Sequence, residues 1–281
     1  MKILVTGASG QLGFDVCRRL NELSIENTGV DIADFDLTHP EQVLSYMHRY
    51  RPGCVVHCAA YTAVDQAETN AADCEAVNAA GTRNLAIGCR DVDASMIYIS
   101  TDYVFPGTGN SAFETNDLKN PLGVYGRTKL EGEKAIRELL NRYFIVRTSW
   151  VFGVHGDNFV KTMLRLGKEK ESLNVVCDQV GSPTYTRDLA VLICEMVQTD
   201  QYGIYHGTNE GYCSWSEFAQ VIMEEANLEC VIHPVMTAEY GSPAQRPLNS
   251  RLSKKCLDDA GFARLPDWHD ALRRYLAEME T

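Results

Sequence analysis

The stretch Ile3-Leu4-Val5-Thr6-Gly7-Ala8-Ser9-Gly10-Gln11-Leu12-Gly13 decides the fold. A short apolar strand runs directly into glycines spaced three apart, and an amphipathic helix through Val16 and Leu20 follows. A strand, a glycine turn and a helix in this order are typical of a dinucleotide-binding unit, although an ordinary strand-to-helix turn remains the alternative. Gly7 allows the tight turn, Gly10 lets the backbone approach a pyrophosphate, and Gly13 lets the helix pack closely. The pyrophosphate would lie at the helix N-terminus.

Further apolar segments alternate with amphipathic ones along the first half of the chain. Strands are predicted at residues 28–31, 54–58, 96–99 and 143–147, and a long helix at about residues 70–89. This alternation predicts an α/β fold with a Rossmann-type, doubly wound parallel sheet. After residue 150, glycine-punctuated loops and short elements predict a smaller mixed lobe. We therefore expect a dinucleotide-binding domain at residues 1–150 and a substrate-binding lobe at 151–281, with an approximate boundary and a possible crossover of the chain between them.

Several polar or small residues end the predicted strands near the expected cofactor. Asp31 is placed to bond the adenosine ribose, and because no arginine follows it, this position weakly favours NADH over NADPH. Asp36 and Leu37 either flank the adenine or form a turn before a helix that Thr38 would cap with Glu41. Ala59 and Ala60 leave room for a ligand at the end of their strand. Asn78 is either an ordinary helix amide or a residue of the site.

A hydroxyl, a phenol and an ammonium form the candidate catalytic set. Thr101 ends the strand at residues 96–99, and Tyr125 and Lys129 lie four residues apart on a predicted helix, so they share one face. A carbonyl reduction needs an acidic O–H, a cation that lowers its pKa, and a second hydrogen-bond donor to the carbonyl oxygen. The alternatives are an exposed Tyr–Lys pair without a role and a Thr101 hydroxyl that only caps the backbone.

Composition excludes several other classes of protein. The formal net charge of -12 and the pI near 5.0 argue against nucleic acid or an anionic membrane as partner. No apolar run approaches the length of about 20 residues that spans a bilayer, and the N-terminal apolar run reaches a glycine too soon for a signal peptide. The ten cysteines show no metal-ligand spacing, which is typical of free thiols in a reducing cytoplasm. We expect no metal site.

The chain resembles the extended short-chain dehydrogenase/reductase family, which acts on nucleotide sugars. The shared motifs are the Gly7-x-x-Gly10-x-x-Gly13 loop, Thr101 and Tyr125-x-x-x-Lys129. A closer resemblance within the family rests on five further segments, at residues 60–65, 100–105, 147–153, 178–184 and 246–250. It implies that NADPH or NADH reduces the C4 ketone of a dTDP-linked 6-deoxyhexulose.

The resemblance also assigns residues to the two ligands. It implies that the dinucleotide contacts the following residues: Gly10, Gln11, Leu12, Asp36, Leu37, Ala60, Tyr61, Thr62, Tyr125 and Lys129. It implies that the sugar nucleotide contacts Thr101, Asp102 and Trp150, and we place the adjacent Tyr103 with them. From its chemistry alone, Trp150 could equally be a core residue. Arg246 either pairs with a diphosphate oxygen or forms a surface salt bridge.

Dehydration, epimerisation and a non-catalytic role are the alternatives to reduction. Dehydratases of this family have a glutamate where Tyr103 stands, so dehydration is not expected. An epimerase of nucleotide sugars at C4 stays open, as does a regulatory subunit that binds the cofactor without catalysis, because fold alone does not decide function. Some members dimerise through magnesium, but Asp15 and Asp188 are shorter than the glutamates needed, and that site is not assigned here. We expect a monomer or homodimer.

Overall fold

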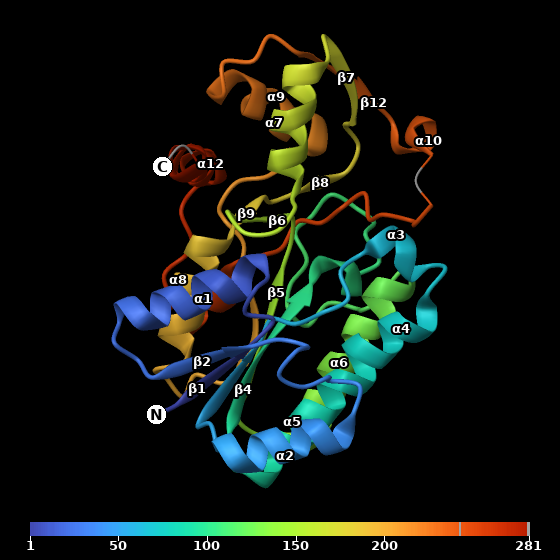
Figure 1. The fold of residues 1–281 in the computed structure, drawn as a ribbon. Coiled ribbons are helices and arrows are strands. Elements are labelled where there is room, and N and C mark those ends of the chain that lie inside the picture. Colours follow the sequence, from blue (N-terminus) through green and yellow to red (C-terminus); the bar gives the residue numbers. More distant parts are fainter. Residues whose placement is uncertain (242, 280–281) are drawn as a thin grey trace.

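The computed structural model describes residues 1–241 and 243–279, and a parallel sheet organises them (Figure 1). The strands of this sheet lie in the order β10-β5-β4-β3-β1-β2, and every neighbouring pair is parallel. Their bounds are β1 (Ile3–Thr6), β2 (Asn27–Val30), β3 (Cys54–His57), β4 (Ser95–Thr101), β5 (Tyr143–Thr148) and β10 (Gly203–His206). The predicted Rossmann-type parallel sheet is confirmed.

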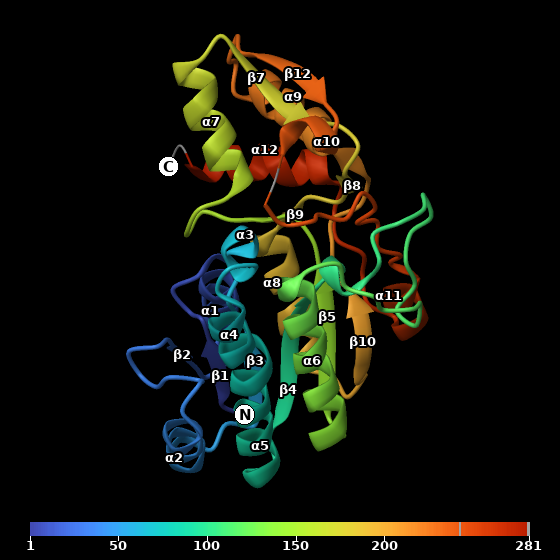
Figure 2. The same cartoon turned by 90° about the vertical axis from the view of Figure 1, so that its right-hand side faces the viewer.

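Both faces of the sheet are buried under helices. Alternate residues of β1 face opposite sides, so Leu4 belongs to one core cluster and Ile3 and Val5 to the other. The Ile3 side is covered by α1 (Gln11–Glu22), α8 (Thr186–Met196) and α11 (Lys255–Ala260). The Leu4 side is covered by α2 (Pro40–Tyr50), α5 (Thr82–Asp91) and α6 (Val124–Leu139) (Figures 1 and 2).

The order of the strands reverses at β1, because β2 is added on one side of it and β3 on the other. This reversal creates a site where a ligand can bind. β1 lies between β2 and β3, so Thr6 pairs in register with Val30 on one side and His57 on the other. The loops that leave β1 and β3 therefore run to opposite faces and open a crevice at the carboxyl ends of the strands. Ligands of open α/β sheets bind at such a switch point.

The helical segment that follows β3 differs in detail from the prediction. After α3 (Val64–Ala67), the chain forms α4 (Ala71–Glu75), a π-helical segment η1 (Ala76–Gly81) and then α5. The long helix predicted at residues 70–89 is thus present, but it has a π-helical insertion around Asn78. Such insertions are frequent at functional sites.

The predicted capping box at Thr38 and Glu41 is wrong. His39 is the N-cap of α2 and Pro40 its first residue, without a side-chain cap. Proline suits this position because its fixed φ fits the helix and it has no N–H to satisfy. The Thr38 hydroxyl instead donates to Asp36 Oδ1 at 2.8 Å, and the same oxygen accepts the Thr38 N–H at 2.8 Å. Asp36 is therefore a turn residue.

The second half of the chain supplies a separate aromatic core above the sheet (Figure 2). In that core, Phe152, Phe218 and Tyr275 lie against one another. The elements around it are β6 (Val151–Phe152), α7 (Phe159–Glu169), β7 (Ser172–Val176), β8 (Val180–Gly181), β9 (Thr184–Tyr185), β11 (Cys213–Ser214), α9 (Trp215–Glu225), β12 (Val231–Val235), α10 (Thr237–Tyr240) and α12 (Trp268–Met279). Between these elements the chain returns to the sheet as α8 and β10. The boundary at residue 150 stays a prediction.

Within residues 1–241 and 243–279, no helix combines the length and the apolar character that crossing a membrane requires.

Candidate active site

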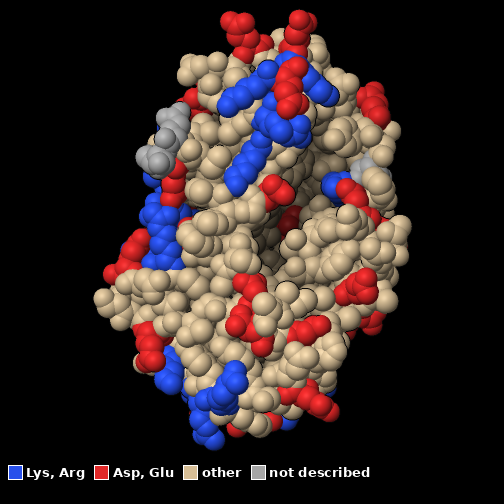
Figure 3. Space-filling model, viewed as in Figure 1, with Lys and Arg blue, Asp and Glu red and all other residues tan. Residues whose placement is uncertain are grey.

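A cavity of about 650 Å³ opens at the carboxyl ends of β1, β3, β4 and β5. Figure 3 shows the same face of the molecule hollowed between the sheet and the second lobe. Most residues that the sequence assigned to cofactor and substrate line this cavity, namely Gly7, Gly10, Gln11, Leu12, Asp31, Asp36, Leu37, Ala59, Ala60, Thr62, Thr101, Asp102, Tyr103, Tyr125 and Lys129. Five assigned residues lie outside its lining: Gly13, Tyr61, Asn78, Trp150 and Arg246.

Two glycines of the loop, Gly7 and Gly13, leave no room for a side chain. Gly7 has φ +69°, and a Cβ there would lie 2.7 Å from the Ala59 backbone nitrogen. A Cβ on Gly13 would lie 2.1 Å from the Gly7 carbonyl oxygen, which explains why Gly13 matters without lining the cavity. Gly10 is the N-cap of α1 and provides no side-chain cap. The first N–H groups of α1 therefore stay available to an anion, as a pyrophosphate requires.

The far end of the cavity is acidic. Asp31 directly follows β2, and its Oδ2 accepts the Ser9 N–H at 2.8 Å, which ties the glycine loop to the second strand. Asp36 and Leu37 also line this end. A carboxylate here can accept the hydroxyls of an adenosine ribose and would repel a phosphate at the 2′ position.

Asn78 holds the loop that follows β3. Its Oδ1 accepts the Tyr61 N–H at 2.8 Å, and its Nδ2 donates to the Tyr61 carbonyl at 3.0 Å. Asn78 is 1% exposed and also donates to Thr128 Oγ1 at 3.3 Å. The amide therefore acts on the loop backbone and joins it to α6, which carries Tyr125.

Tyr125 and Lys129 lie one turn apart on α6, opposite the end of β4. The Lys129 ammonium lies 4.1 Å from the centre of the Tyr98 ring, and the residue is 2% exposed. Burial lowers the pKa of Lys129 to about 7, against the attraction of Glu133. Burial raises the pKa of Tyr125 well above its ordinary value, and the Thr101 hydroxyl opposes that rise. The phenol is therefore protonated at neutral pH and can deliver a proton.

The residues after Thr101 complete this end of the cavity. The Thr101 hydroxyl donates to Asp102 Oδ1 at 3.0 Å and accepts the Tyr103 N–H at 3.2 Å. The Tyr103 ring meets the Tyr125 ring edge-on, with ring centres 5.4 Å apart. Burial raises the pKa of Asp102 to about 6, although its hydrogen bond to Thr101 works the other way.

Two residues assigned to the substrate lie beside the cavity. Trp150 has φ +50° and stacks on Trp215, with ring centres 3.7 Å apart. Arg246 Nη2 lies 2.9 Å from Asp65 Oδ2. The salt bridge foreseen as an alternative for Arg246 is thus present, and its partner Asp65 lies on α3 in the first half of the chain.

Several further residues line the cavity without a signal of their own in the sequence. They are Thr6, Ser9, Val30, Ile32, Phe35, Cys58, Val64, Val77, Ile99, Ser100, Thr148, Ser149, Val151 and Asp157. Many directly precede or follow a strand end, so their positions could have been inferred once the strand order was known. Asp157 had no such signal, because it reaches the cavity from a loop of the second lobe.

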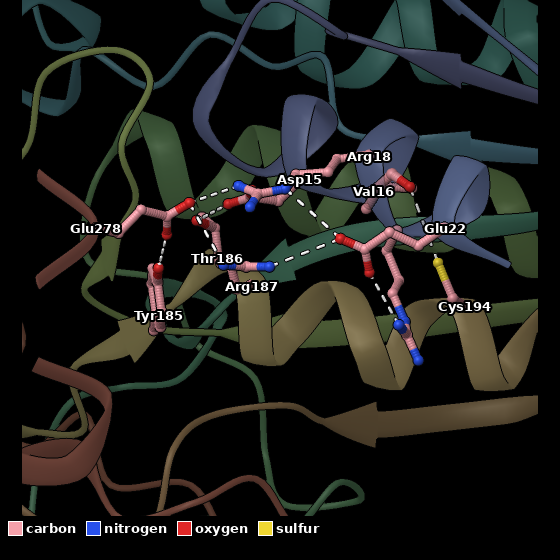
Figure 4. Close-up of polar contacts among 10 residues, drawn as sticks. Asp15, Val16, Arg18, Glu22, Tyr185, Thr186, Arg187, Cys194 and Glu278 are labelled. Carbon is pink, nitrogen blue, oxygen red and sulfur yellow. Dashed lines mark hydrogen bonds and ion pairs between the residues drawn. The ribbon is translucent and has the colours of Figure 1, made fainter. Parts of the chain in front are cut away.

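Asp15 and Asp188 lie on α1 and α8, and both carboxylates have protein partners. Figure 4 shows the surroundings of Asp15. Asp15 accepts from the Thr186 hydroxyl, and Glu278 pairs with Arg18 and Arg187. Asp188 is held by both terminal nitrogens of Arg274. The described residues contain no group of three or more His, Cys, Asp or Glu side chains arranged for a metal ion.

Comparison with known proteins supplies the family. Residues 1–281 match the family described as RmlD substrate binding domain. The chain is 42% identical to the spore coat polysaccharide biosynthesis protein SpsK of Bacillus subtilis, over 100% of this chain and 98% of that protein. It is 38% identical to a dTDP-4-dehydrorhamnose reductase of Aggregatibacter actinomycetemcomitans, over 99% of each. A crystal structure of dTDP-4-dehydrorhamnose reductase from Bacillus anthracis in complex with NADP is 44% identical, with a TM-score of 0.96 over 99% of both chains.

Proposed function

This chain belongs to the RmlD substrate binding domain family, and on that premise we propose that it is an NAD(P)H-dependent dTDP-4-dehydrorhamnose reductase. It would reduce the C4 ketone of dTDP-6-deoxy-L-lyxo-4-hexulose to give dTDP-L-rhamnose. The observation that carries this proposal is the meeting of Thr101, Tyr125 and Lys129 at one end of a cavity whose other end is the glycine loop.

The cavity suits a reduced nicotinamide dinucleotide. The pyrophosphate would lie on the N–H groups at the start of α1, beside Gly10, and Asp31 would accept from the adenosine ribose. Lys129 would bond the ribose of the nicotinamide half. When bound, the cofactor supplies the hydride for the ketone carbon.

Residues of the chain would then stabilise and protonate the oxygen of the ketone. The Thr101 hydroxyl, turned away from Asp102 Oδ1, would donate a hydrogen bond to it, and Tyr125 would give it the proton that turns the developing alkoxide into an alcohol. A free phenol has a pKa of about 10, so the phenolate needs a counter-charge. Lys129, one turn away, provides that charge. Tyr103 stands where dehydratases of this family have a glutamate, and the absence of that carboxylate favours simple reduction over dehydration.

The sugar nucleotide would occupy the cleft between the sheet and the second lobe. We propose that Asp102 and Tyr103 contact the sugar, that Trp150 borders it, and that Arg246 attracts the diphosphate. Residues 1–150 would then hold most of the dinucleotide and residues 151–281 most of the sugar nucleotide. We also propose that the enzyme works in the cytoplasm, because its ten cysteines are all free thiols.

The test is the oxidation of NADPH or NADH by the purified protein and dTDP-6-deoxy-L-lyxo-4-hexulose. We expect oxidation that requires the sugar, and a fall in kcat of about 10²–10⁴-fold in Tyr125→Phe. An unchanged rate in Tyr125→Phe would remove this tyrosine as the acid but leave the reductase standing. No oxidation with either cofactor would overturn the assignment of substrate, and interconversion of C4 epimers with retained cofactor would establish an epimerase instead.

A further inference from the structure

A buried carboxylate lies one helical turn beyond Lys129. Glu133 follows Tyr125 and Lys129 at intervals of four residues on α6, so the three side chains share one face of the helix. Glu133 is 2% exposed. The proposed reduction gives it no direct part, since Glu133 does not line the cavity.

Glu133 binds two strands at once. Its Oε1 accepts from the Ser100 hydroxyl at 2.6 Å and from Arg147 Nε at 2.9 Å, and its Oε2 accepts from Arg147 Nη2 at 2.7 Å. Arg147 is 1% exposed, and its remaining terminal nitrogen donates to the Thr115 carbonyl at 2.8 Å. Both charges are therefore removed from water and satisfied by a bidentate pair.

The partners of Glu133 lie at the ends of two strands that line the cavity: Ser100 lines it directly, and Arg147 immediately precedes the lining residue Thr148. Ser100 and Arg147 are paired in register on β4 and β5, and the next pair along these strands is Thr101 and Thr148. One carboxylate thus joins α6 to the ends of both strands. A buried ion pair is costly to desolvate, and a well-packed apolar pair often stabilises a fold equally well. Stability alone therefore does not account for a charged pair at this place.

The charge of Glu133 matters because of the groups around Lys129. The groups that influence or contact its ammonium come from four elements and their ends, and they are His57, Cys58, Cys74, Tyr98 and Glu133. Burial lowers the pKa of His57 to about 3 and raises the pKa of the Cys58 thiol and the Tyr98 phenol, so these groups are neutral at pH 7. Glu133 is the carboxylate in this set.

We propose that Glu133 is a positioning residue of the reaction, which aligns Thr101 with Tyr125 through Ser100 and Arg147 and serves as the buried counter-charge of Lys129. This inference rests on the proposed reductase function for its kinetic test, but it also has a test through cofactor binding alone.

The first experiment compares the pH profiles of kcat/KM for wild type, Glu133→Gln and Glu131→Gln. Glutamine keeps an acceptor for Ser100 but loses the charge, and it leaves Arg147 as an unopposed cation. Both changes lower the pKa of Lys129, so the protonated form that supports activity is lost at a lower pH. We therefore expect the alkaline limb of the kcat/KM profile to lie about one pH unit below that of wild type. Glu131 is the matched control, because it lies on the same helix but is exposed and paired with Lys134 at 2.7 Å. Its variant should keep the wild-type profile.

Two further variants separate positioning from folding. Glu133→Met with Arg147→Met removes both charges, so no buried cation remains unopposed, and its alkaline limb should lie between those of wild type and Glu133→Gln. Ser100→Ala leaves the charge intact, and we expect a lower kcat with an unshifted profile. A folded Glu133→Gln protein whose alkaline limb coincides with that of wild type would overturn the inference.

Binding of NADPH provides the readout that does not need the sugar. The affinity of Glu133→Gln for NADPH, followed by nicotinamide fluorescence, should begin to fall at a pH about one unit below that of wild type. If the sugar is not reduced but this shift appears, the proposed substrate fails and the role of Glu133 stands. If the sugar is reduced and neither profile shifts, the reductase stands and the role of Glu133 fails.

Discussion

Arg246 Nη2 lies 2.9 Å from Asp65 Oδ2, so a salt bridge joins the segment that carries Arg246 to α3. The Ala244 N–H donates to the other oxygen of the same carboxylate at 3.2 Å. The side chains of Arg246 and Asp65 are 27% and 44% exposed, so the bridge lies at the edge of the cleft. Arg246 also hydrogen-bonds to Tyr103, which lines the cavity. The guanidinium is thus held in place before any substrate arrives.

Replacing Arg246 should weaken the binding of the sugar nucleotide and spare the chemistry. In Arg246→Ala, we expect KM for the dTDP-sugar to rise about tenfold or more with kcat little changed, because a diphosphate contact is equally strong in the ground and transition states. Steady-state kinetics with saturating cofactor measure this. Arg165→Ala, at an exposed arginine of α7 paired with Glu169, is the control and should leave KM unchanged. A normal KM in Arg246→Ala would mean that the bridge only joins the lobes.

Removing the Asn78 amide should loosen the cofactor site and the fold together. Asn78→Ala leaves the Tyr61 N–H and carbonyl without their partners, and we expect a loss of about 1–3 kcal/mol in the free energy of unfolding. The affinity for NADPH should fall as well, because the loop after β3 lines the cavity. Denaturant unfolding and a fluorescence titration give the two values. Full cofactor affinity in a destabilised variant would show that Asn78 serves the fold only.

Because of the Asp102 carboxyl, acid should raise the free energy of unfolding and lower kcat/KM. Its pKa is about 6 in the folded protein, against 3.8 for an ordinary aspartate, so folding favours the protonated form. Its contribution to the free energy of unfolding is therefore full below about pH 4 and is lost as the pH rises through 6. On the proposed contact with the sugar, the ionised carboxylate is the stronger acceptor for a sugar hydroxyl, so kcat/KM should rise over the same range. In Asp102→Asn, the pH dependence of the free energy of unfolding and of kcat/KM should both flatten near pH 6. If kcat/KM of this variant still falls in acid, the fall belongs to another group.

Asp31 should set the choice between the two cofactors. Its carboxylate lines the far end of the cavity and is bonded to the Ser9 N–H. In Asp31→Ala, loss of the negative charge should raise the ratio of kcat/KM for NADPH over NADH by about tenfold, since a 2′-phosphate is no longer repelled. The measurement is a pair of saturation curves on one enzyme preparation. An unchanged ratio would place the 2′ position away from Asp31.

The sequence predicted the parts of this site that depend on local pattern. The glycine loop, the pairing of Tyr125 with Lys129 on one helical face, and the end of β4 at Thr101 follow from periodicity and from residue types that tolerate few alternatives. The positions of the five main strands follow from the same reasoning. These features are decided over fewer than about 20 residues, a range over which neighbouring side chains specify the backbone.

The features that the sequence did not predict depend on contacts between distant segments. Glu133 has the spacing of Lys129 and Tyr125, but its partners Ser100 and Arg147 lie on strands whose pairing is known only from the sheet. The cap of α2 was missed because Asp36 takes up the Thr38 hydroxyl. The place of β10 (Gly203–His206) beside β5 in the main sheet likewise depends on the tertiary fold.

That return of β10 to the sheet has a consequence for how the protein is made. A nascent chain that has emerged only to residue 150 ends its sheet at β5, whose outer edge then offers unpaired N–H and C=O groups. That edge is covered only when residues 203–206 have left the ribosome, some fifty residues later. The first half is therefore not a finished unit during synthesis. Exchange of the second half between relatives would also exchange a strand of the cofactor-binding sheet.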